Sequence, residues 1–293
     1  MGTTTSGSRR RAGFTVSAAV LGLLAAAGAP AFAAAGGSAE QPPAASHSDA
    51  SRSDAGSLRA QPKTPQAPAA HAPAAQAPAA HAPAAQAPVA QVPVGISRLA
   101  QGPGHDIAIT IDDGPDPRWT PQVLDVLRKN DVKATFCMIG TEAQAHPDLV
   151  RQVAAAGHRL CDHSVDHDVT MDHKPVAYQS RQILAAKEMI EKAAPGVSVD
   201  YYRAPGGAFT PASREIAAAG GMRPLGWSVD PKDWSRPGLP AILSTVENGL
   251  PAQPTVLFHD GGGDRSQTVA ALTRYLPWLK AQGYSFTFPA RTA

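Results

Sequence analysis

The sequence predicts an α/β fold in which parallel strands alternate with helices. Short apolar or β-branched runs recur along residues 105–293, helical patterns lie between these runs, and the polar clusters follow strand ends. Strands that alternate with helices are joined by crossover connections, so they run parallel and form either a barrel or a doubly wound sheet. In both architectures the functional site lies where the strands end.

The first strand and helix of this domain have the clearest signals. Residues 107–111 are apolar and rich in isoleucine, and the run is closed by Asp112-Asp113-Gly114-Pro115. Thr120 and Pro121 then form an N-cap and first-turn pair that predicts a helix. The same alternation continues along the chain. Strands are expected at 107–111, 134–139, 158–161, 201–203, 225–229, 256–259 and 285–288, and helices at 120–130, 147–156, 175–193, 211–219, 240–249 and 267–282.

The N-terminus predicts a signal peptide over residues 1–33. Arginines at 9–11 precede an apolar run at 14–29, and a small-x-small site follows at 31–33. An uncleaved anchor is the alternative, although the run is shorter than the roughly 20 residues that a spanning helix needs. The arginines also loosely resemble a twin-arginine export signal, but general secretion fits better. We therefore expect a secreted protein that is extracellular or associated with the cell wall.

Residues 34–104 predict a disordered, Ala/Pro-rich linker. From Pro68 to Pro93 a proline recurs every five residues, which breaks helices and leaves no alternating apolar face. His71 and His81 recur in this repeat; a metal-binding tract is possible, but spaced and solvated histidines are the simpler interpretation. The linker leaves one catalytic domain, at 105–293.

Composition indicates no macromolecular partner beyond a substrate. The formal net charge of the 293 residues is +2, and no Lys/Arg-rich stripe is interleaved with aromatic residues. This argues against nucleic-acid binding. We expect a monomer without a stable protein partner.

The two adjacent carboxylates of Asp112 and Asp113 form the first candidate cluster. Adjacent side chains point in different directions, so one carboxylate can ligate a metal while the other accepts a proton, provided that nearby positive charge keeps both ionised. An Asp-Asp-Gly-Pro sequence is also a common polar turn. The cluster therefore needs further residues to indicate function.

Those residues follow the strand that ends at Cys161. His163 and His167 are four residues apart and can converge on one point from a helix or from a loop. Such pairs are often structural, but together with Asp113 they give two imidazoles and one carboxylate. This ligand set leaves positions open on a metal for water and substrate.

Three further clusters lie downstream. Arg203, within Arg203-Ala204-Pro205, could make a surface ion pair, and Trp234, at the end of Asp230–Trp234, could belong to the core. His259 is more distinctive, because an imidazole at the end of an apolar strand is available as a general acid.

In this order and spacing the five clusters resemble the carbohydrate esterase family 4 polysaccharide deacetylases, also called the NodB homology domain. The resemblance covers about residues 105–289, through motifs at 110–115, 163–167, 203–205, 230–234 and 257–259. Two positions differ from the family pattern: Ile111 stands where phenylalanine is usual, and Gly206 follows Pro205 where an aromatic residue is usual.

The resemblance implies a distorted (β/α) barrel of seven or eight strands, with a groove for a sugar polymer. Asp113, His163 and His167 would bind a divalent metal, Zn²⁺ first and Co²⁺ or another ion as alternatives. The metal would polarise the acetyl carbonyl and activate a water molecule. Asp112 would then take the proton from that water.

The remaining motif residues would complete the reaction and the groove. A backbone N–H near Gly206 would stabilise the oxyanion, and His259 would protonate the departing amine. Arg203 would hold Asp112 ionised, and Asp233 would pair with His259. The residues expected to contact the substrate are Pro205, Gly206, Trp234 and Leu257.

The function expected from the resemblance is the hydrolysis of N-acetyl groups on a polysaccharide. Cell-wall peptidoglycan is the first candidate substrate, chitin-type oligomers the second and acetylated xylan the third. Two alternatives stay open: an esterase acting on O-acetyl groups, and a catalytically silent carbohydrate-binding wall protein.

Cys137 and Cys161 are the only cysteines, and they lie in two consecutive expected strands. Adjacent strands run about 4.8 Å apart, which suits a disulfide, and export supplies oxidising conditions. We expect a disulfide, with two buried free thiols as the alternative.

Overall fold

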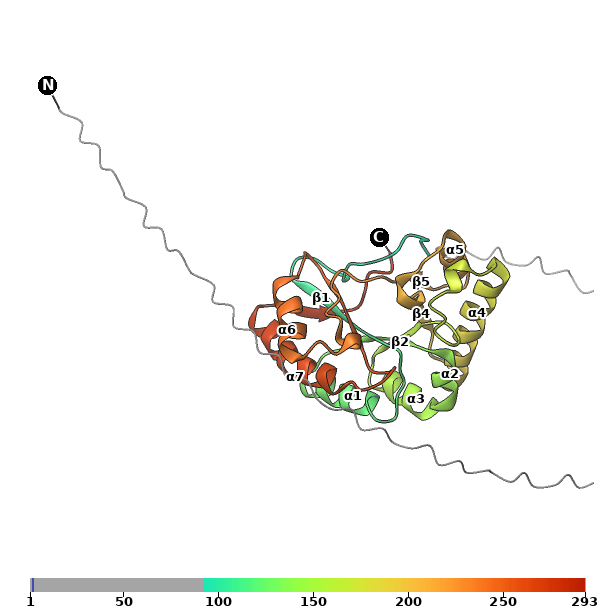
Figure 1. Cartoon of the computed structure of the whole chain (residues 1–293), viewed down its shortest axis with the longest axis horizontal. Coiled ribbons are helices and arrows are strands. Elements are labelled where there is room, and N and C mark those ends of the chain that lie inside the picture. Colours follow the sequence, from blue (N-terminus) through green and yellow to red (C-terminus); the bar gives the residue numbers. More distant parts are fainter. Residues whose placement is uncertain (1, 3–91, 293) are drawn as a thin grey trace, which may run out of the picture. The chain divides into compact units, whose positions relative to one another are not determined.

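The computed structural model describes Gly2 and residues 92–292. The expected signal peptide, apart from Gly2, and the expected linker up to residue 91 lie outside the described residues. The rest forms a seven-stranded sheet in which every strand pair is parallel, surrounded by helices (Figure 1). The strands are β1 Asp106–Asp112, β2 Thr135–Met138, β3 Arg159–Asp162, β4 Val199–Tyr202, β5 Arg223–Pro224, β6 Thr255–His259 and β7 Ser285–Thr287. The α/β class expected from the sequence is confirmed.

β1 is the centre of the sheet. The strand order is β5-β4-β3-β2-β1-β6, and β7 also pairs with the first residues of β1. Ile107, Ile109 and Ile111 are fully buried, as expected for a strand that is covered on both faces. The sheet curls into an incomplete barrel. Its open side, between β5 and β6, is spanned by an isolated parallel bridge between Val229 and Val256.

The helices cover the sheet in two groups (Figure 1). α2, α3, α4 and α5 lie on one flank, and α1, α6 and α7 lie on the other. Each helix presents an apolar stripe to the core; Val123 and Leu127 of α1, for example, are fully buried. The helices are α1 Thr120–Lys129, α2 Gly140–Ala145, α3 Pro147–Ala155, α4 Val176–Ala193, α5 Pro211–Ala219, α6 Leu239–Asn248 and α7 Ser266–Ala281. None of the described helices is both long enough and apolar enough to span a membrane.

Three expectations from the sequence need correction. The strand expected at 225–229 is absent, and the only strand nearby is the two-residue β5 at 223–224. After β5 the chain turns away from β4 and crosses toward β6, where Val229 bridges to Val256. α2 was not expected, since its six residues carry too short an apolar pattern. Residues 97–100 belong to the ordered domain rather than to the linker: Ser97 bridges to Leu225, and Ala100 is buried and bridges to Pro289. Beyond the last proline of the repeat, at 93, backbone N–H groups are available for these bridges.

Cys137 and Cys161 are paired across β2 and β3 and form a disulfide. The two cysteines are 24 residues apart, so the bond closes a loop and reduces the number of conformations open to the unfolded chain. We expect removal of the bond by Cys137→Ala/Cys161→Ala to lower the free energy of unfolding by about 3.5 kcal/mol in the chain-entropy model. Urea unfolding of the parent and the double variant measures this, and thiol titration of the unfolded, unreduced parent should find no free thiol. Two free thiols would contradict the bond.

His158 lies away from the predicted site residues and makes the stability of the domain depend on pH. It is buried at the start of β3, and its Nδ1 accepts a hydrogen bond from the Ala134 N–H at 3.1 Å. Burial, together with the charge of Lys133, lowers the pKa of His158 to about 4. The unfolded chain, with an ordinary histidine pKa, therefore binds the extra proton first as the pH falls.

Stability should consequently be lost as the pH falls from about 6.5 toward 4. Between pH 7.5 and 4.5 the contribution of His158 amounts to about 2.5 kcal/mol. The variant His158→Asn keeps a hydrogen-bond acceptor but does not titrate. We expect its unfolding free energy in urea to fall less than that of the parent over this range. Equal slopes for the two proteins would show that His158 is not the group responsible.

Candidate metal centre and active site

The polar clusters predicted from the sequence come together in one hollow of about 540 Å³. It lies where β1, β3, β4 and β6 end, as expected for parallel strands. Predicted residues that line it come from each of those strand ends and from the Trp234 loop. They are Asp112, Asp113, His163, His167, Gly206, Trp234, Leu257 and His259.

Asp112 and Arg203 form a buried ion pair beneath the hollow. Arg203 is fully buried, and its Nη1 donates to Asp112 Oδ1 at 2.5 Å and to Thr110 Oγ1 at 3.0 Å. Its other nitrogens donate to the carbonyls of Leu225 and Gly226. Arg203 is therefore not a surface ion pair. Burial raises the pKa of Asp112, and the charge of Arg203 opposes that rise, so the carboxylate is more basic than an ordinary Asp.

One carboxylate oxygen of Asp113 has no hydrogen-bond partner among the described residues and faces His163 and His167. This atom, the buried Oδ1, lies 3.5 Å from Nε2 of both His163 and His167. The Nδ1 of His163 lies 2.8 Å from the Arg203 carbonyl, so it carries the proton and leaves Nε2 as a lone pair. Burial also lowers the pKa of His163 to about 3, which keeps the ring neutral.

A neutral imidazole nitrogen and a carboxylate oxygen thus face each other with no proton between them. Two acceptors in this position repel unless a cation lies between them, and an unpaired buried carboxylate oxygen costs free energy. One ligand atom from each of Asp113, His163 and His167 lies within 4.8 Å of the other two. The donor set and its geometry therefore fit a divalent metal.

The two histidines converge from a loop rather than from a helix. Ser164 and His167 both have left-handed backbone, with φ of 67° and 56°. The loop is held by the side chain of Asp162, which accepts from the Ser164 N–H at 2.7 Å, and by Gln182 of α4, which accepts from the Val165 N–H at 2.9 Å. The rings of His163 and His167 meet edge to face, with centroids 4.7 Å apart.

His259 and Asp233 form a second pair beside Asp112, because Asp112 and His259 are register partners in β1 and β6. His259 Nδ1 lies 2.8 Å from Asp233 Oδ1, and the His259 N–H donates to Oδ2 of the same carboxylate at 2.9 Å. Burial alone would lower the pKa of His259. The hydrogen bond and charge of Asp233, with the charges of Asp112 and Asp113, outweigh it and raise that pKa. His259 is therefore held toward its protonated form.

Trp234 and Gly206 also line the hollow. Trp234 is 50% exposed, so it is not a core residue. Gly206 has a left-handed φ of 59°, and a Cβ built on it would meet only Val169, at 3.9 Å. Because no aromatic side chain stands there, the hollow is open beside Gly206. Pro205 is buried under this turn rather than exposed in the hollow.

Comparisons with known proteins identify the family of this chain. The sequence profile of the family described as Polysaccharide deacetylase matches residues 100–225. A peptidoglycan-N-acetylglucosamine deacetylase of Bacillus cereus is 43% identical over 182 residues, which cover 61% of this chain and 84% of that protein. The chain belongs to the polysaccharide deacetylase family.

Two further proteins support the assignment. A chitooligosaccharide deacetylase of Sinorhizobium fredii is 39% identical over 189 residues, covering 61% of this chain and 87% of that protein. The crystal structure of the Bc1960 peptidoglycan N-acetylglucosamine deacetylase superposes with a TM-score of 0.62 at 28% identity, covering 65% of this chain and 89% of the other. The resemblance stated from the sequence motifs is thereby confirmed.

The deacetylase site also contains residues that the sequence did not single out. They are Val169, Gly207, Trp227, Gly262 and Arg265, whereas Ala204 and Asp230 belong to the predicted motifs. Trp227 lies beneath the guanidinium of Arg203, 5.5 Å from it, and a Cβ on Gly207 would approach the Trp227 ring to 2.7 Å. A tryptophan three residues after β5 carries no local signal for this contact.

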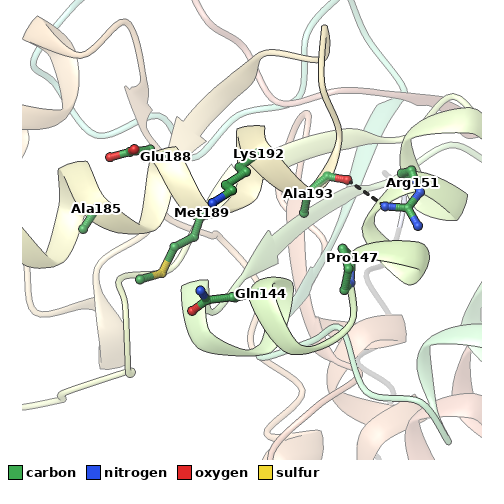
Figure 2. Close-up of a pocket in the computed structure, with 8 residues that line it drawn as sticks. All are labelled: Gln144, Pro147, Arg151, Ala185, Glu188, Met189, Lys192 and Ala193. Carbon is green, nitrogen blue, oxygen red and sulfur yellow. Dashed lines mark hydrogen bonds between the residues drawn. The ribbon is translucent and has the colours of Figure 1, made fainter.

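A second hollow of about 510 Å³ lies away from these groups, between α2, α3 and α4 (Figure 2). Its charged side chains are Arg151, Glu188 and Lys192, and Arg151 donates to the Ala193 carbonyl. Its lining includes no histidine and only one carboxylate. This hollow is therefore not a candidate catalytic site of the deacetylase domain.

Proposed function

We propose that this protein is an exported, metal-dependent deacetylase that hydrolyses N-acetyl groups of cell-wall glycan, with peptidoglycan as the first candidate. One observation carries the proposal. A fitting metal-ligand set, Asp113-His163-His167, lines the same hollow as Asp112, which is paired with Arg203, and His259, which is paired with Asp233. The site thus combines a metal position, a base and an acid around one hollow. The related peptidoglycan and chitooligosaccharide deacetylases support the substrate class.

The metal would be Zn²⁺ or a similar divalent ion such as Co²⁺, held by Asp113, His163 and His167. When bound, it supplies Lewis-acid chemistry: it polarises the acetyl carbonyl and makes a water molecule more acidic. Asp112 accepts the proton of the attacking water, because burial makes its carboxylate more basic than usual while Arg203 fixes its orientation.

His259 supplies the proton that the departing amine needs. Its Nδ1 is bound to Asp233, so the Nε2–H remains free to donate. A backbone N–H near Gly206 would stabilise the charge that develops on the carbonyl oxygen. The half-exposed ring of Trp234 would pack against the sugar.

Export is part of the proposal. The order of arginines, apolar run and small-x-small site in residues 1–33 supports it, and a disulfide is typical of oxidising compartments. Mass spectrometry of the protein from the culture medium, with the N-terminus expected at residue 34, tests this part.

Acetate release from three substrates tests the activity itself. Purified peptidoglycan, N-acetylglucosamine oligomers and acetylated xylan are each incubated with the protein and added Zn²⁺ or Co²⁺. We expect metal-dependent release, greatest from peptidoglycan. Preference for xylan would identify an O-acetyl esterase, and glycan binding without release would identify a silent wall protein; either result overturns the proposed function.

A further inference from the structure

Arg265 is a buried cation whose hydrogen bonds join two loops of the site. It is 3% exposed and immediately precedes the first turn of α7. Its Nη1 donates to the Trp234 carbonyl at 3.2 Å, Nη2 donates to the Gly262 carbonyl at 3.0 Å, and Nε donates to the Gly261 carbonyl. The planar guanidinium therefore fixes the loop of Trp234 relative to the glycine loop after β6.

Thr268 holds Asp233, the residue directly before Trp234. Its buried hydroxyl donates to Asp233 Oδ2 at 2.7 Å, and that oxygen also accepts the His259 N–H. Arg265 is the N-cap residue of α7 and Thr268 follows it by three residues, so both lie at the start of this helix. The start of this helix thus holds two consecutive residues, Asp233 through its carboxylate and Trp234 through its backbone.

The glycine loop held by Arg265 packs directly on the metal-ligand Asp113. A Cβ built on Gly262 would lie 3.1 Å from Arg265 Nη2 and 3.1 Å from Asp113 Oδ2. A Cβ on Gly261 would overlap the Asp113 carbonyl at 2.2 Å. Only glycine allows this close approach of the two backbones.

We propose that Arg265 and Thr268 are positioning residues for the deacetylation reaction, with separate effects. Arg265 fixes the Trp234 wall, and so controls how tightly the sugar binds. Thr268 fixes the Asp233 carboxylate, and so controls how His259 is oriented for proton donation. This inference rests on the proposed function, since it assigns Trp234 to the sugar and His259 to the leaving amine.

The physical reason is that Trp234 cannot hold itself in place. Half of its surface is exposed, so core packing alone does not order it. A sugar that binds against a mobile ring must first immobilise it, and that cost weakens binding. The Arg265 hydrogen bond to its carbonyl removes this cost in advance.

Arg265 is tested with Arg265→Lys and Arg265→Met in zinc-supplemented protein, with Arg274→Lys on the exposed face of α7 as the control. Two substrates are compared: an N-acetylglucosamine oligomer, which reaches Trp234, and an aryl acetate too small to do so. We expect KM for the oligomer to rise about tenfold in Arg265→Lys, and kcat/KM for the oligomer to fall about tenfold more than that for the aryl acetate. A change in kcat with unchanged KM, or equal losses on both substrates, would overturn the role.

Trp234→Ala shows whether Arg265 acts through the ring. If it does, the double variant Trp234→Ala/Arg265→Lys should be no worse on the oligomer than Trp234→Ala alone. Multiplying effects would overturn the inference. Thermal unfolding accompanies each variant: if Arg265→Met does not fold, Arg265→Lys decides, and unfolding of both variants would assign Arg265 to general stability instead.

Thr268→Val is the matching test for the acid, with Thr273→Val as the control, because the Thr273 hydroxyl donates only within α7. The carboxylate of Asp233 loses one hydrogen bond, and we expect kcat to fall about tenfold on both substrates with little change in KM. A KM effect alone would overturn this half of the proposal.

Oligomer binding, followed by tryptophan fluorescence, separates this inference from the proposed function. If the parent releases no acetate from any substrate, the proposed activity fails. Arg265→Lys should still weaken oligomer binding about tenfold relative to the parent. Unchanged binding in that variant, or no binding by the parent, overturns the positioning role.

Discussion

His163→Ala is expected to abolish tight metal binding and to lower kcat/KM for acetate release by about 10³-fold or more. The metal contributes several kcal/mol of transition-state stabilisation in enzymes of this kind, and each 1.36 kcal/mol is a factor of ten in rate. His163 supplies a neutral Nε2 at 3.5 Å from Asp113 Oδ1, and its other nitrogen is fixed by the Arg203 carbonyl. No other imidazole of the described residues is fixed in this way toward Asp113. Asp113→Ala should have a loss of the same size.

His173→Ala is the matched control, because the side chain of His173 is 83% exposed and lies in a neighbouring surface turn. Metal content is measured by elemental analysis after dialysis, and activity is measured with and without a chelator. The parent and His173→Ala should lose activity on chelation and regain it with Zn²⁺. Full activity of the chelated parent, or of His163→Ala, would refute a metal mechanism.

The sequence predicted the frame of the fold because local signals and periodicity agree there. The isoleucine run predicted β1, and the first helix begins at Thr120 as expected. Thr120 is not the N-cap, however: Trp119 holds that position, and the Thr120 hydroxyl donates to Asp260 instead. β5 could not be predicted, because its two residues are defined by pairing with β4 and not by an apolar run of their own. The turn to left-handed backbone at Asp113 likewise depends on the glycine loop that packs against it.

For the site, the sequence identified the groups that carry distinctive chemistry and missed those that hold them. His163, His167 and Asp113 have side chains that can ligate a metal, and they follow the ends of strands. Arg265 binds only backbone carbonyls, one of them 31 residues away, and carbonyls leave no mark in a sequence. Thr268 looks like any polar residue of a helix until Asp233 is found beside it. The available signal was an arginine two residues after a run of three glycines and directly before a helix.

Asp112→Asn and His259→Ala should each lower kcat by about 10² to 10⁴ while metal binding is kept. Asparagine preserves the shape of Asp112 but cannot take a proton, and alanine removes the donor at 259. Neither residue is among the three ligands, so metal content should match that of the parent within error. Either variant within a few-fold of the parent rate would refute its role in proton transfer, and loss of the metal would show that the residue acts as a ligand instead.

The pH profile links His259 to its partner. Asp233 raises the pKa of His259, so the imidazole stays protonated above the usual histidine range, and activity should fall as the pH rises through that raised value. Asp233→Asn removes the charge that favours the protonated ring. The alkaline limb of kcat should therefore move to lower pH, and the rate at neutral pH should fall because less of His259 carries its proton. The acid limb depends on Asp112, which lies next to His259, and it should move less because the substitution changes the partner of His259 and not the Arg203 partner of Asp112. If the alkaline limb stays in place in Asp233→Asn while the rate falls evenly at every pH, Asp233 orients the ring without setting its protonation.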